Sequence, residues 1–244
     1  MNLAAGLLAT VMLALLPTSS VAQLLPPMQA SQPEEFDMYV AILEAPSEAA
    51  RAELARRFEQ TWPQSELLAH TLYLEAEAHR TLGDSNASRA AAEKALALVR
   101  DHLPGLVLLS ELTGNAAANE KELLQAENYA QTGLELLERF RAPRSIPLQE
   151  LERARNGTRS RLHAALGLIA FKRGQLTSAI REFEAAEACM PREDPVILYR
   201  LAKLYRESNQ IQRSIATFQR VIKLSEPTLQ RLARSELQQL QQNR

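Results

Sequence analysis

The sequence predicts an all-α fold built from repeated pairs of antiparallel helices, and three observations support this. After Pro33 no segment alternates apolar and polar residues with the period of a strand. Leu and Ala far outnumber Val and Ile, and apolar residues recur three and four positions apart, as in Phe36, Tyr39, Val40 and Leu43. The chain also repeats itself. With 244 residues, 46% of them hydrophobic and 23% charged, it is long and apolar enough to bury a core.

The amino terminus has the composition of a signal peptide. Residues 3–16 are almost continuously apolar, Pro17 ends the run, and small residues at 20–22 fit a signal-peptidase site. The run is shorter than the about 20 residues that a spanning helix needs. We expect cleavage after Ala22 and an exported protein, periplasmic or secreted. No Lys or Arg precedes the apolar run, so an uncleaved anchor or a buried helix is the alternative.

The repeat emerges when the chain is aligned with itself. At an offset of 35 residues, one series matches a second in size or turn propensity: Leu166, Gly167, Ala170, Gly174, Ala179, Phe183 and Ala186 match Leu201, Ala202, Tyr205, Asn209, Ser214, Phe218 and Val221. At an offset of 91 the first series falls on Ala76, His79, Gly83, Ser88, Ala92 and Ala95. One such hairpin cannot bury its apolar face alone, so neighbouring hairpins must stack.

The spacing has a physical cause within each hairpin. Small residues such as Gly167 and Ala202 allow the second helix to approach the first closely, and Phe183 and Phe218 fill the remaining gap. Gly174 and Asn209 lie between the two helices of their hairpins, where a residue that tolerates positive φ can end the first helix.

This pattern resembles the tetratricopeptide repeat (TPR), a helix-turn-helix unit of 34 residues. The resemblance implies a right-handed helical-repeat solenoid of antiparallel helix pairs over residues 34–244, preceded by a linker at 23–33. The units are expected at about 36–63 (degenerate), 69–100, 103–140 (irregular), 160–191 and 195–227, followed by a capping helix at 228–244. Ala92 stands where the repeat usually has a bulky ring, so its unit is expected to pack loosely.

Two stretches depart from the regular spacing. Residues 115–119 are expected to form a lengthened turn in the irregular unit. Residues 148–155 follow Pro147 and are expected to lengthen the next helix, with Asn156-Gly157 as a point where that helix could break.

The last segment carries one apolar stripe on an otherwise Arg- and Gln-rich helix, as expected of an end cap. The stripe consists of Leu229, Leu232, Ala233, Leu237 and Leu240. A membrane-surface helix is the alternative, and the largely neutral polar face argues against it.

The sequence offers no motif for catalysis or for a cofactor. It has no phosphate-binding loop, HExxH, nucleophile-elbow serine or paired-cysteine motif. Glu75 and His79 lie one helical turn apart, and an ion pair is favoured over a metal site there. His163 is expected to be a core imidazole and Cys189 a buried thiol. We therefore predict a protein that is not an enzyme and has no metal or cofactor. A hydrolase or transferase using His79 or His163 is the rival hypothesis.

In TPR proteins the first helices of successive units line a concave groove that commonly holds a partner segment. The resemblance therefore implies a partner-binding groove, and the positions that would face it are His70, Tyr73, Glu77, Arg80, Arg161, Ala164, Leu168, Phe171, Tyr199, Lys203 and Arg206, with Arg200 nearby. An apolar floor with a basic wall would suit an acidic or aromatic segment. Solvated helix faces without a ligand are the alternative. The Lys and Asn pairs of chaperone-binding TPR proteins are missing, which disfavours a chaperone co-factor.

Charge divides the chain into two unlike halves. Residues 1–138 hold 8 Lys and Arg against 19 Asp and Glu, and residues 139–244 hold 20 against 10, so the halves carry −11 and +10. Such halves could associate head to tail at low salt. The missing aromatic stacking motifs and the expected export argue against nucleic acid as a partner.

These features lead to one main functional hypothesis. The chain is expected to be an exported non-catalytic adaptor that binds a protein or peptide segment in assembly of a bacterial envelope or secretion complex. It is expected to have no stable membrane insertion after signal cleavage. Self-association through the charged halves is the alternative.

Overall fold

The computed structural model describes residues 28–140 and 147–242, and the expected signal peptide lies outside this part of the chain. The described residues form eleven α-helices and no strand. The helices are α1 (Pro33–Leu43), α2 (Glu48–Thr61), α3 (Leu68–Thr81), α4 (Ser85–Leu98), α5 (Leu103–Ala116), α6 (Glu120–Arg139), α7 (Leu148–Lys172), α8 (Leu176–Cys189), α9 (Pro195–Glu207), α10 (Ile211–Leu224) and α11 (Pro227–Gln242). The predicted all-α class is confirmed.

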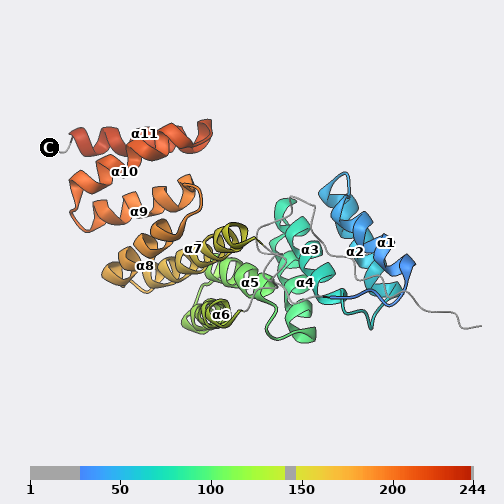
Figure 1. Ribbon diagram of the computed structural model, residues 1–244. Coiled ribbons are helices and arrows are strands. Elements are labelled where there is room, and N and C mark those ends of the chain that lie inside the picture. The colour runs from blue at the N-terminus through green and yellow to red at the C-terminus, as the bar shows by residue number, and fades with distance from the viewer. Residues whose placement is uncertain (1–27, 141–146, 243–244) are drawn as a thin grey trace, which may run out of the picture.

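The helices form consecutive antiparallel pairs that stack along an arc (Figure 1). Helices α1 to α10 make five such pairs, and each pair also contacts the next along the chain. The last helix, α11, packs on α10. No helix in the described ranges is long and apolar enough to cross a membrane. The residues that the sequence assigns to a groove lie on α3, α7 and α9, which are first helices of their pairs. We call the exposed side of the first helices α3, α5, α7 and α9 the first-helix face.

Turn and cap residues explain where the helices begin and end. Gly83, Gly174 and Asn209 have φ values of 82°, 72° and 61°, and each lies two residues after the end of the first helix of its pair. This left-handed conformation favours Gly and Asn, as the sequence predicts. Several N-cap side chains accept a backbone N–H of the first helical turn, namely Ser47, Asp84, Asn119 and Asp194.

The close approach of paired helices is confirmed at Gly167. A Cβ atom at this position would lie 2.6 Å from Cδ2 of Phe183, which is closer than carbon atoms can pack. Phe183 and Phe218 are each buried in the gap of their own hairpin, as expected. The absence of a side chain at Gly167 therefore makes room for the ring of Phe183.

The 69–100 unit does not show the gap expected at Ala92. Ala92 is fully buried in one apolar cluster with Tyr73, Leu108 and Leu109. The two leucines come from α5, so the next pair of helices supplies the volume that a ring would fill within the unit.

Helix α7 runs without interruption for 25 residues, so the break considered at Asn156-Gly157 does not occur. Leu151, Ala154 and Leu162 on α7 are buried in one cluster with residues of α5 and α6. Burial on both sides of Gly157 favours the helical conformation over the modest propensity cost of glycine. The sequence predicts a lengthened turn at residues 115–119. The connection between α5 and α6 is shorter, residues 117–119, because α5 continues through Ala116.

The last helix buries less of its predicted stripe than expected. Ala233 and Leu240 are buried in one cluster with Phe218 and Val221 of α10, whereas Leu232 is 49% exposed. The contact with α10 therefore follows the line of Ala233 and Leu240, and Leu232 lies at its edge.

Candidate protein-binding groove

The predicted groove residues fall into two groups along the first-helix face. Tyr73, Glu77, Arg80 and Arg161 meet where α3, α5 and α7 come together. Phe171, Tyr199 and Lys203 meet in a hollow between α7 and α9.

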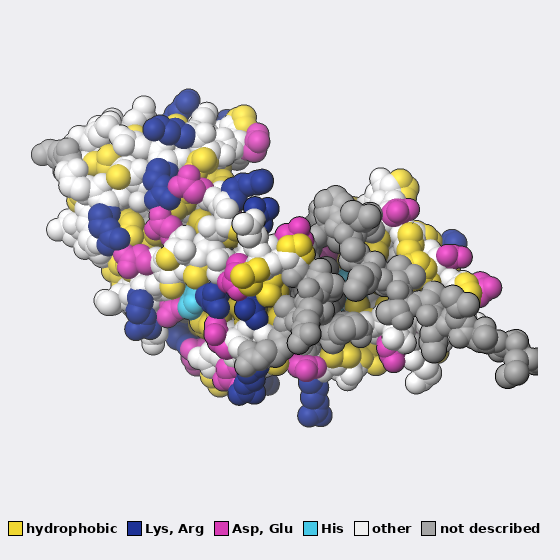
Figure 2. Space-filling view, viewed as in Figure 1, with side chains coloured by type: hydrophobic (Ala, Val, Ile, Leu, Met, Phe, Trp, Pro, Cys, Tyr) yellow, Lys and Arg dark blue, Asp and Glu magenta, His cyan; other side chains and the backbone are white. Residues whose placement is uncertain are grey.

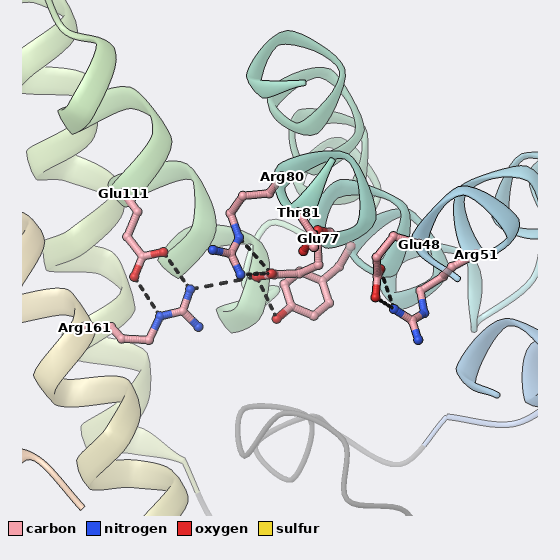
Figure 3. A network of polar contacts seen from close by, with 8 residues as sticks. Glu48, Arg51, Glu77, Arg80, Thr81, Glu111 and Arg161 are labelled. Carbon is pink, nitrogen blue, oxygen red and sulfur yellow. Dashed lines mark hydrogen bonds and ion pairs between the residues drawn. The ribbon is translucent and has the colours of Figure 1, made fainter. Parts of the chain in front are cut away.

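The first group is a network of ion pairs in which acidic side chains neutralise the basic ones (Figure 3). Nε and Nη2 of Arg161 each lie 2.7 Å from a carboxylate oxygen of Glu111 on α5. Arg161 also lies 3.9 Å from Glu77, which accepts a hydrogen bond from Arg80 Nε at 2.9 Å. Burial alone would lower the pKa of Arg161, but the carboxylate of Glu111 raises it on balance. We call Glu77, Arg80, Glu111 and Arg161 the paired network.

Two predicted groove residues are buried instead of lining the surface. His70 and Tyr73 are each 2% exposed, and their rings stack at a centroid distance of 5.5 Å. Tyr39 of α1 lies 6.1 Å from the ring of His70, and His102 lies 5.9 Å from it. Tyr73 shares a buried cluster with Leu108 and Leu109 of α5. Contacts with α1 at His70 and with α5 at Tyr73 therefore bury positions that would face a groove in a regular repeat. The hydroxyl of Tyr73 still donates to Glu77, at 3.3 Å.

The second group surrounds a hollow of about 220 Å³. Its apolar lining includes Leu168 and Phe171 of α7 and Val196 of α9, and Tyr199 and Lys203 lie along the same side of α9. We call it the α7–α9 hollow. Ala164, another predicted groove position, is buried in the core below it.

Arg206 does not join this hollow. Its guanidinium pairs with Glu236 of α11, to which the hydroxyl of Tyr199 also donates at 3.4 Å. The ring of Tyr199 packs edge-on against Phe218 at 5.7 Å. Arg206 therefore stabilises the contact between α9 and α11.

Glu111 and Glu236 are the site residues that sequence reasoning missed. Glu111 lies in the irregular 103–140 unit, whose first helix has no clear repeat register. Glu236 lies on the capping helix, beyond the last unit. Each was an acidic residue on a predicted helix, but only the packing of distant helices places it beside Arg161 or Arg206.

The remaining titratable candidates lie elsewhere in the fold. His79 and Glu75 are 3.7 Å apart on α3, as expected of an ion pair. His163 is half-buried, and its Nδ1 lies 2.9 Å from Glu182, so it is a paired surface group and not a core imidazole. Cys189 is also only half-buried, because it is the last residue of α8. The described residues contain no group of three or more His, Cys, Asp or Glu able to hold a metal ion.

Comparison with known proteins finds the repeat in sequence and the solenoid in structure. A model of the tetratricopeptide repeat matches residues 69–102 and 196–228. No curated protein matches the sequence. A thermophilic TPR protein of Thermus thermophilus is 20% identical, with a TM-score of 0.50 over 85% of this chain and 97% of that chain. MamA from Desulfovibrio magneticus is 18% identical, with a TM-score of 0.50 over 80% of this chain and 97% of that chain.

These likenesses confirm the fold class predicted from the sequence. The chain contains two segments that match the tetratricopeptide repeat, and its stack of helix pairs has the fold of tetratricopeptide-repeat solenoids.

Proposed function

We propose that the chain is an exported, non-catalytic adaptor that binds a protein or peptide segment in assembly of a bacterial envelope or secretion complex. The observation that carries the binding part is the α7–α9 hollow, which exposes Phe171 and Val196 on the first-helix face. Exposed large apolar side chains around a concavity favour contact with another molecule. The apolar run at residues 3–16 supports export.

The binding part is tested by partner recovery in the cell of origin. The full-length chain with a carboxyl-terminal tag is cross-linked and purified as wild type, as Phe171→Asp and as Leu224→Asp. Phe171 and Leu224 are 41% and 44% exposed, so they are matched in exposure, but only Phe171 lines the hollow. We expect Phe171→Asp alone to lose the partner. Equal recovery from all three proteins would contradict the groove.

Export is tested separately by fractionation of the same cells and sequencing of the amino terminus. A periplasmic or secreted chain that begins at Gln23 supports the proposal. A cytoplasmic chain that retains residues 1–22 contradicts it.

Self-association through the charged halves is a second candidate, favoured by the charges of −11 and +10. On the face shown in Figure 2, many Lys and Arg side chains lie over the end of the molecule that α7 to α11 form. Some of this charge is already offset within the chain, because Arg159 pairs with Glu138, and Arg173 with Glu120 and Glu127. Sedimentation at low and high salt tests the idea, and a monomer at both would eliminate it.

A further inference from the structure

The α7–α9 hollow has the size of a site for one or two side chains. Its volume of about 220 Å³ lies below the roughly 300 Å³ at which pockets for drug-sized molecules begin. Phe183 and Leu204 form part of its floor and are buried. Phe171 and Val196 line it although they are 41% and 49% exposed, so an apolar side chain placed between them would remove further apolar surface from water.

The hollow is also bordered by positive charge that the chain does not neutralise. Arg200 and Lys203 both line it, and neither forms an ion pair within the described ranges. The side chain of Arg200 donates to Asn115 at 3.2 Å, which is a neutral partner. Burial lowers the pKa of Arg200, and the more distant Asp194 and Glu111 offset this only in part. Glu207 is the one carboxylate in the lining, and it forms no ion pair in the described structure.

The paired network, also on the first-helix face, shows the opposite condition. Arg80 and Arg161 are held by Glu77 and Glu111, so their charge is already satisfied. An incoming carboxylate would have to displace a charged hydrogen bond there, whereas at Arg200 and Lys203 it would displace only water and one neutral amide. Of these two sites, the hollow is therefore the one whose cations have no carboxylate partner in the described structure, and Arg200 and Lys203 there outnumber Glu207.

Building on the proposed function, we propose that the α7–α9 hollow binds a peptide segment in which an aromatic or large aliphatic side chain is flanked by side-chain carboxylates. The apolar side chain enters between Phe171 and Val196, and the carboxylates pair with Arg200 and Lys203. The apolar contact supplies most of the affinity, and the charges orient the segment and accelerate its association.

The test uses fluorescein-labelled peptides capped at both ends, so that side chains supply every carboxylate. The probe has a Phe between Asp residues in a Gly/Ser background, and matched peptides replace Phe with Ser, or Asp with Asn or Lys. Fluorescence anisotropy is measured with the full chain. We expect the probe to bind about tenfold more tightly than each matched peptide, and its affinity to fall with salt.

Variants of the protein identify the cations. Lys203→Glu is expected to weaken binding of the probe about tenfold, with Lys203→Gln intermediate, whereas Lys223→Glu on α10 changes it less than about twofold. Lys223 is the control because it is also a lysine without an ion pair in the described structure, and it is exposed on α10, outside the lining of the hollow. Thermal melts verify that each variant is folded.

Three results would overturn the inference. The first is equal binding of the Asp, Asn and Lys peptides, and the second is equal effects of Lys203→Glu and Lys223→Glu. The third is Lys203-dependent binding of vesicles containing phosphatidylserine without binding of the probe.

If Phe171→Asp abolishes partner recovery but the probe does not bind, this inference fails while the proposed function stands. If Phe171→Asp leaves recovery unchanged, the proposed function itself fails.

Discussion

The two repeats that match the family model build their cores in different ways. In residues 196–228, Phe218 fills the gap between α9 and α10, and the hydroxyl of Ser214 donates to the carbonyl of Ala202 at 2.8 Å. In residues 69–102, the equivalent positions are Ala92 and Ser88. Ala92 provides no ring, and the buried hydroxyl of Ser88 has no hydrogen-bond partner in the described structure.

In the 69–102 repeat, side chains of neighbouring helices complete the core around Ala92. Leu108 and Leu109 of α5 share a buried cluster with Ala92, and the ring of His70 lies near that of Tyr39 on α1 and that of His102 at the end of the repeat. A repeat can therefore lose its own ring when the adjacent hairpins supply the volume. The consequence is that the 69–102 repeat depends on its neighbours and on buried imidazoles, whereas the 196–228 repeat carries its own aromatic core.

The largest expected effect is at the ring of the later repeat. Phe218→Ala should lower the free energy of unfolding by about 3–5 kcal/mol, because it removes a fully buried ring and leaves a cavity between α9 and α10. The matched change in the earlier repeat, Ala92→Gly, should cost only about 1 kcal/mol through helix propensity. Urea unfolding measures both, with the exposed Leu224→Ala as control. If Phe218→Ala and Ala92→Gly lowered the free energy of unfolding equally, the proposed difference between the two repeat cores would be wrong.

The buried imidazoles should make the earlier repeat sensitive to acid. Burial, and then the nearby His102, lower the pKa of His70 to about 3, and burial lowers the pKa of His102 to about 4. The unfolded chain binds these protons near pH 6.5, so the folded state loses stability as pH falls below that value, by about 2 kcal/mol per imidazole at pH 5.

The acid effect is measured from urea midpoints at about pH 7.5 and about pH 5. His70→Phe should reduce the loss between these conditions by about 2 kcal/mol. The control is His163→Gln, which changes a half-buried histidine on α7, outside the 69–102 repeat. If the stability of His70→Phe depends on pH as that of the wild type does, the buried imidazole of His70 is not a source of the acid sensitivity.

A smaller effect is expected at the equivalent turn residues Gly83 and Asn209. Both have positive φ, but only Gly83 lacks a side chain. Gly83→Ala should therefore cost about 1–2 kcal/mol, because a Cβ disfavours the left-handed region. Asn209→Gly should change stability by less than about 0.5 kcal/mol. Thermal melts that show no loss for Gly83→Ala would contradict the conformational argument.

The smallest effect separates the two serines. Ser214→Ala should cost about 1 kcal/mol, because it removes the hydrogen bond to Ala202. Ser88→Ala should be neutral or slightly stabilising, because it removes a buried hydroxyl that has no partner in the described structure. Paired denaturation curves measure the difference. If Ser88→Ala is as costly as Ser214→Ala, the cores are more alike than their hydrogen bonds indicate.

Local signals in the sequence predicted most of the fold. The small residue at Gly167, the ring at Phe183 and the turn residues Gly174 and Asn209 act within one hairpin, so their spacing is readable from the chain. The repeat also predicted that Phe171, Tyr199 and Lys203 would share a surface, and the structure brings them together.

The parts of the site that the sequence missed depend on contacts between distant helices. Tyr39 of α1 lies against the ring of His70. Glu111 reaches Arg161 from the irregular unit, and Glu236 reaches Arg206 from the capping helix. No local pattern encodes these contacts, since each is set by how one hairpin packs on another. The same holds for the continuity of α7 through Gly157, which burial against α5 and α6 determines.

The unbroken helix α7 fixes the distance between the paired network and the α7–α9 hollow. Arg161 and Phe171 lie on this one helix, ten residues apart, which corresponds to about 15 Å along its axis. Because no joint lies between them, the paired network and the hollow cannot shift relative to each other without bending the rod. A ligand that reached both sites would need its own groups about 15 Å apart, so an unbroken α7 would limit such ligands by length as well as by charge.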